Sequence, residues 1–154
     1  MCIRDSIGLT LTGASMTSVT LNAPRAGLAW VSARARVFIT HTNGTMDNVI
    51  CKLSKTSGDV NSPSYGIALV RIPAINPTSA AQGHVDTIEI TRVFSVARGS
   101  NTFHLNCLES HGSGGDSILA PEVNALFVPL RYGTGPAPAA LNQEQSGPDV
   151  ARTE

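Results

Sequence analysis

Apolar and polar residues alternate along most of the chain, which is the pattern of β-strands that bury one face. The longest run is 28–42, where Ala, Val and Ile occupy every second position from Ala29 to Ile39 between Ser, Arg and Thr residues. Shorter runs of the same kind occupy 18–23, 47–54, 65–72, 85–96, 102–109 and 123–132. No segment keeps an apolar period of 3.6 residues. The sequence therefore predicts an all-β protein with a two-sheet sandwich fold.

The apolar phase of these strands also predicts the core, because a shift of one residue would turn every side chain to the opposite face. The predicted core residues are Val19, Leu21, Val31, Val37, Ile39, Val49, Leu53, Ile88, Ile90, Phe94, Phe103, Leu105 and Phe127.

Segments rich in Gly, Pro and Ser separate the strands. A tight turn at 98–101 joins two strands into a predicted hairpin, and irregular connections are predicted at 55–64, 73–84 and 110–117. The 73–84 segment is a candidate binding loop, since loops carry much of the function of β-proteins.

Length and composition narrow the possible functions. A chain of 154 residues fits one domain. Eleven basic and eleven acidic residues cancel, so no overall field attracts nucleic acid. No apolar run reaches the roughly twenty residues that a membrane-spanning helix needs. We therefore expect neither a nucleic-acid partner nor a membrane span.

The two ends of the chain differ from its middle. Residues 1–6, MCIRDS, resemble a translated sequencing-adapter remnant and are predicted to be non-native. Residues 8–132 are the predicted β-sandwich domain. From Gly133 the chain is rich in Pro, Ala, Gly and Gln without apolar periodicity, so 133–154 are predicted to be a disordered tail.

The order of the strands and turns resembles the jelly-roll domains of the tumour necrosis factor and complement subcomponent q superfamily. The segments that carry this resemblance are 19–24 (VTLNAP), 27–30 (GLAW), 47–54, 91–96 with Gly99, 102–105, 117–119 and 124–129. The resemblance implies an antiparallel jelly roll of about eight strands. It further implies a secreted or particle-surface module that assembles as a homotrimer, with bacterial and phage versions among its relatives.

The resemblance also places the strands of Cys51 and Cys107 side by side in one sheet. Both cysteines lie in the inward phase of their strands, so a disulfide between them is geometrically open. Two separate buried thiols remain the alternative, because pairing cannot be deduced from sequence alone.

The residues that could carry catalysis or bind a metal are scattered. The four histidines, His41, His84, His104 and His111, form no cluster with acidic residues in the sequence. The Gly-rich stretch 112–115 lacks the strand and helix that position a nucleophilic serine. Glu109 and Asp116 flank it, but two carboxylates fall short of the six to eight oxygens that calcium takes. We therefore expect neither an enzyme nor a cofactor.

Residues 43–45, Asn-Gly-Thr, match an N-glycosylation signal in a predicted turn.

The most informative surface feature is a stripe of residues on the polar face of the longest strand. It consists of Trp30, Arg34, Arg36 and Phe38, and interfaces favour such aromatic and Arg side chains. Cover by the 55–64 or 73–84 connection is the competing explanation. The sequence thus predicts a non-catalytic, oligomeric recognition or structural module whose protein or glycan ligand is unknown. A carbohydrate-binding sandwich and a phage tail-fibre or capsid domain are the alternatives.

Overall fold

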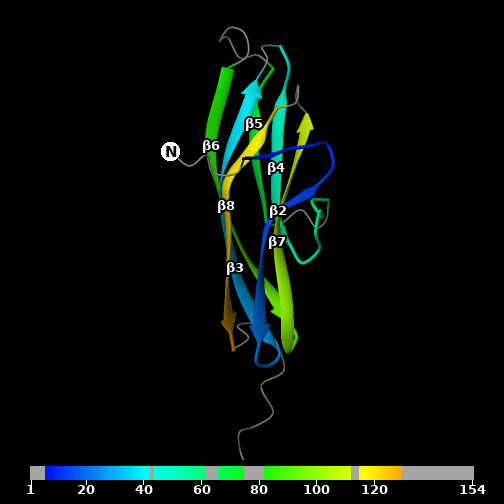
Figure 1. Ribbon diagram of the computed structural model, residues 1–154, viewed down its shortest axis with the longest axis vertical. Helices are drawn as coiled ribbons and strands as arrows, with labels where there is room; N and C mark the ends of the chain where they lie inside the picture. The colour runs from blue at the N-terminus through cyan, green and yellow to red at the C-terminus, as the bar shows by residue number, and fades with distance from the viewer. Residues whose placement is uncertain (1–5, 42–43, 62–65, 75–81, 112–114, 130–154) are drawn as a thin grey trace, which may run out of the picture.

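The computed structural model describes residues 6–41, 44–61, 66–74, 82–111 and 115–129, and these residues form two antiparallel sheets packed face to face (Figure 1). Their strands are β1 (Ser6–Gly8), β2 (Ala14–Ala23), β3 (Gly27–His41), β4 (Asp47–Ser54), β5 (Ile67–Ile72), β6 (Gln82–Val96), β7 (Gly99–His111) and β8 (Ser117–Val128). The described residues contain no helix that is long and apolar enough to cross a membrane.

The strand order matches the predicted jelly roll. Sheet A has the order β1-β8-β3-β6 and sheet B the order β2-β7-β4-β5. Each sheet therefore contains strands from both halves of the sequence, and the chain crosses repeatedly from one sheet to the other. Residues 9 and 10 make such a crossing. The Leu9 N–H donates to the Asp116 carbonyl at 2.8 Å, while the Thr10 carbonyl accepts from the Glu109 N–H at 3.0 Å.

Several strand boundaries differ from the prediction by three residues or more. β2 begins at Ala14 rather than at residue 18. β6 begins at Gln82 rather than at residue 85, because 82–84 pair with the end of β3. β7 begins at Gly99, so the predicted four-residue turn is shorter. β8 begins at Ser117 and ends at Val128, six residues earlier than predicted at its start and four at its end.

The early start of β8 has a local cause. The predicted strand begins at residue 123, after Pro121, and proline cannot donate to a ladder. Ala120, immediately before it, has φ 47°, and the β3–β8 register shifts between Arg34 and Arg36. A bulge thus accommodates the proline inside the strand and allows 117–119 to pair.

The core lies between the sheets, where the inward phases of both meet. Val19, Leu21 and Phe127 are partly buried and pack against it, and all the other predicted core residues are buried. Small alanines fill the β3 side of the core, since Ala29, Ala33 and Ala35 are also buried. Phe94 on sheet A and Phe103 on sheet B meet across the layers with ring centroids 5.0 Å apart.

Candidate functional site

The outer face of sheet A carries an exposed apolar row. Trp30 on β3 is paired in register with Val93 on β6 and with Leu126 on β8. All three face away from the core, because their strands alternate and their neighbours Ala29, Val31 and Phe94 are buried. Their exposed fractions are 52, 57 and 60 %. Three large apolar side chains therefore lie side by side on one face of the sheet, and we call them the apolar row.

The chemistry of this face changes stepwise along the strands. Beside the apolar row, Ser32 is paired with Thr91 and Asn124, and the next row places Arg34 between Glu89 and Glu122. The Arg34 Nε lies 3.7 Å from the Glu89 carboxylate, with both side chains largely exposed. Such an exposed pair adds little to stability. Its effect is to make this end of the face charged rather than apolar.

Two shallow hollows lie on this face, one beside the apolar row and one beside the charged residues. The first, about 220 Å³, is lined by Trp30, Ser32, Asn124, Ala125 and Leu126. The second, about 250 Å³, shares Ser32 and Asn124 with the first and continues past Arg34, Glu89 and Glu122. The outer face of sheet A is thus hollowed from its apolar row to its charged row.

The predicted stripe of Trp30, Arg34, Arg36 and Phe38 does lie on this face, but Phe38 differs from the rest. Its ring packs over Gly83 on β6, where a Cβ atom would lie 2.8 Å from the ring. Phe38 is half-buried, whereas Trp30, Arg34 and Arg36 are exposed. Because Gly83 has no side chain, the Phe38 ring can lie flat against the neighbouring strand, which covers part of it.

The competing explanation for the stripe was that one of two connections, 55–64 or 73–84, covers it. The described part of the first, 55–61, lies instead on the outer face of sheet B, where the Gly58 N–H donates to the Asn106 Oδ1 at 2.9 Å. Of the second, 75–81 lie outside the described residues. No described residue of the 55–61 connection is among those lining the hollows on sheet A.

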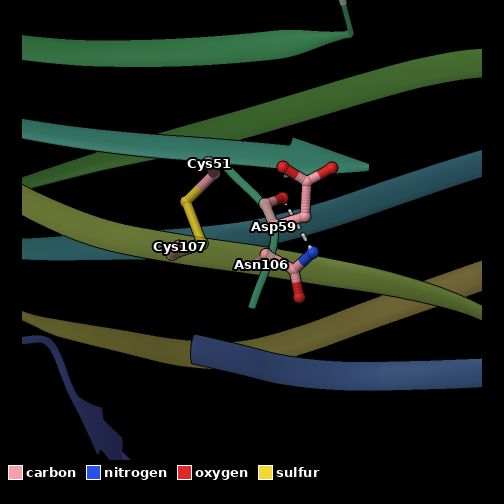
Figure 2. Close-up of a disulfide and its surroundings, with 4 residues drawn as sticks. All are labelled: Cys51, Asp59, Asn106 and Cys107. Carbon is pink, nitrogen blue, oxygen red and sulfur yellow. Dashed lines mark hydrogen bonds between the residues drawn. A yellow bond between two sulfur atoms is a disulfide. The ribbon is translucent and has the colours of Figure 1, made fainter. Parts of the chain in front are cut away.

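A disulfide joins the two central strands of sheet B. Cys51 on β4 and Cys107 on β7 are paired in register with their Cα atoms 4.1 Å apart, and both are buried. Figure 2 shows the bond beside Asn106, whose amide donates to the Asp59 carbonyl at 3.0 Å. The crosslink and the covering 55–61 connection therefore reinforce the same strands from opposite faces.

A buried lysine secures that connection. Lys52 is fully buried, and its Nζ donates to the Asp59 carboxylate at 3.2 Å. Partial burial tends to raise the pKa of Asp59, but hydrogen bonds from Ser54, Lys52 and the Asn61 N–H lower it below its usual value. Asp59 therefore stays ionised in neutral solution and neutralises the lysine charge.

Four ionisable residues are buried together at the opposite end of the sandwich from the apolar row. They are His41 at the end of β3, Asp47 at the start of β4, Glu109 near the end of β7 and Asp116 just before β8. His41 Nδ1 is hydrogen-bonded to the Asp47 carboxylate. Among the described residues, no group of three or more His, Cys, Asp or Glu has an arrangement that could hold a metal ion.

The other residues singled out from the sequence do not join these groups. His84 is exposed, and His104 Nδ1 is hydrogen-bonded to the Ser15 hydroxyl at 3.0 Å. Asn43, residues 112–114 and the side chain of His111 lie outside the described residues. The sequence prediction missed Val93 and Leu126, although each is a large apolar residue in the outward phase of its strand, which is the signal that identified Trp30.

Comparisons with protein-family models, with curated proteins and with solved structures find no match for this chain. The functional inference therefore rests on the fold and on the surfaces described above.

Proposed function

We propose that this protein is a non-catalytic recognition or structural module that self-associates through the outer face of sheet A. The observation that carries the proposal is the apolar row, because Trp30, Val93 and Leu126 are neighbours in register and each is more than half exposed. Contiguous apolar surface of this kind usually marks an interaction site, whereas isolated exposed apolar residues do not.

The energetics suggest an association that depends on concentration. Burying a large apolar side chain fully contributes about 1.5–3 kcal/mol, so covering the exposed parts of the three contributes roughly 2.5–5 kcal/mol per copy. Even a millimolar complex needs about 4 kcal/mol of net binding free energy, after the loss of translational and rotational freedom on association has been offset. Further area must therefore come from the flanking Leu28 and Val128, which adjoin the apolar row.

The expected stoichiometry is a trimer, which the superfamily resemblance implies. A secreted or particle-surface location fits the buried Cys51–Cys107 disulfide, because structural disulfides persist in oxidising compartments. The low charge content, 14 %, also favours an association face, since interface cores are depleted in charge.

Sedimentation of the full-length protein and of Trp30→Glu, Val93→Ser and Leu126→Ser variants tests this proposal. Leu69→Ser is the matched control, because Leu69 is 56 % exposed but belongs to sheet B. We expect the mass to rise with concentration for the wild type and the control and to stay monomeric for the three row variants. A wild type that is monomeric at millimolar concentration would refute self-association.

Carbohydrate binding is a second candidate function, favoured by the hollow that combines Trp30 with the hydroxyl of Ser32 and the amide of Asn124. An exposed indole can stack on the apolar face of a sugar ring, while the polar neighbours can bond to its hydroxyls. Asn124→Ala separates the two functions. It should abolish sugar binding, measured by calorimetry with neutral oligosaccharides, but should leave sedimentation unchanged.

A further inference from the structure

The four ionisable residues at the end of the sandwich are contributed by both sheets. His41 and Asp116 belong to the sheet A side, and Asp47 and Glu109 to sheet B. Their exposed fractions are all 3 % or less. The carboxylates of Asp47 and Glu109 on sheet B lie close enough to Asp116 for their charges to act on it, and like charges in a buried place repel one another.

Asp116 occupies a central position among these contacts. Its Oδ1 accepts a hydrogen bond from the Thr40 N–H at 2.9 Å, and its carbonyl accepts from the Leu9 N–H at 2.8 Å. One residue thus fastens the beginning of β8 to the end of β3 and to the chain segment that crosses between the sheets. Any change in its charge acts directly on these three segments.

The cluster also has unsatisfied polar atoms. Among the described residues, Asp116 Oδ2, Asp47 Oδ1 and His41 Nε2 have no hydrogen-bond partner although all three are buried. An ionised oxygen without a partner in such a place is costly, and a proton removes most of that cost. The geometry favours the neutral form of one carboxyl.

Among the described residues, no basic side chain pairs with Asp116. Residues 9–13 and β2 carry no ionisable side chain. On β5 the charged residue is Arg71, which is exposed and donates to Met46 Sδ, and on β6 the nearest ionisable residue is His84, which is exposed. His41 is hydrogen-bonded to Asp47 rather than to Asp116.

We propose that this end of the sandwich is a proton-binding site, at which Asp116 takes up one proton from mildly acidic solution and thereby tightens the junction between sheets A and B. The proton neutralises the sheet A carboxylate that lies near Asp47 and Glu109, so repulsion between the layers falls. The module thus holds its two sheets together more firmly in acid than at neutral pH, independently of the apolar row.

The direction of the pKa shift of Asp116 agrees with this geometry. Burial is the main cause that raises its pKa, the Thr40 N–H acts against it, and the charges of Glu109 and Asp47 add to the rise, to about 6. The unfolded-state value is near 3.8. Because the folded form binds the proton more tightly, the resulting stability is complete below about pH 3.8 and is lost as the pH rises through about 6.

The test compares the unfolding equilibrium of the wild type and of Asp116→Asn by chemical denaturation between pH 4 and 7.5. An amide keeps the oxygen that accepts from Thr40 but cannot ionise. The ratio of the two folding constants should change roughly 100-fold in favour of the wild type as the pH falls across this range. Asp86→Asn is the control, because Asp86 lies exposed on β6 and should follow the wild type.

A second measurement covers the case in which Asp116→Asn fails to fold. Carboxyl carbon resonances of the wild-type protein report the Asp116 titration directly, and amide exchange at Leu9 and Thr40 reports the junction. We expect a midpoint near pH 6 and slower exchange below it. Parallel stability curves for the two proteins, or a midpoint near pH 4, would overturn the proposal.

Discussion

Lys52 on β4 is paired in register with Asn106 on β7, and both side chains are fully buried although they lie on the outer face of sheet B. The cover comes from the 55–61 connection. The Asn106 amide donates to the carbonyls of Thr56 and Asp59 and accepts from the Gly58 N–H. The hydrogen bonds of the buried Asn106 side chain therefore fix the position of the 55–61 connection on the sheet.

Asn106→Ala should therefore lower the free energy of unfolding by roughly 2–4 kcal/mol, because it leaves the Gly58 N–H and two carbonyls without their partner. Urea unfolding measures this loss. Asn124→Ala provides the reference, since Asn124 is exposed on sheet A and its replacement should cost less than about 0.5 kcal/mol. Equal losses for both variants would contradict the role given to Asn106.

The disulfide between Cys51 and Cys107 spans 56 residues of sequence. In the chain-entropy model, a loop of this size contributes about 4 kcal/mol. A Cys51→Ser, Cys107→Ser double variant should lose stability of this order. Thiol counting on unfolded, unreduced wild type should find one reactive thiol, from Cys2, and three thiols would rule out the crosslink.

Phe94 and Phe103 stack across the two sheets, and both are buried. Replacing either with Ala should cost about 3–5 kcal/mol. The double variant should cost less than the sum of the two single losses, since the rings share one contact. Melting temperatures close to that of the wild type would mean that the inward register is wrong.

Gly83 on β6 should resist substitution because the ring of Phe38 rests on it. Gly83→Ala forces the ring outward and should cost about 1 kcal/mol or more. If the ring is the cause, a Phe38→Ala background should remove most of that cost. An unchanged penalty in that background, measured by thermal unfolding, would point to the backbone instead.

Alternation along the strands was enough to predict most of the fold. It placed Asp47–Ser54 at its observed bounds and assigned buried residues correctly on β3, β4 and β7. It failed where tertiary pairing overrides local preference. The start of β8 contains a proline that only a bulge can accommodate, and the start of β6 is a Gln-Gly-His stretch that forms a strand by pairing with β3.

The surfaces were harder to predict than the core. Trp30 stood out because one strand carries an aromatic residue in its polar phase, but the apolar row also needs Val93 and Leu126, which lie 63 and 96 residues further along the chain and are adjacent only through pairing with β3. The buried ionisable cluster has the same origin. Its four members come from different elements, and no local pattern in the sequence marks any of them as buried.

The most direct test of self-association uses Trp30, which is the only tryptophan in the chain. Half of its surface is exposed in the single chain, so its fluorescence should be readily quenched by acrylamide at low protein concentration. We predict that quenching weakens and emission shifts to shorter wavelength as concentration rises, in step with the sedimentation mass, for the wild type and for Leu69→Ser. Quenching that stays constant while the mass increases, or a mass that never increases, would contradict an interface on the outer face of sheet A.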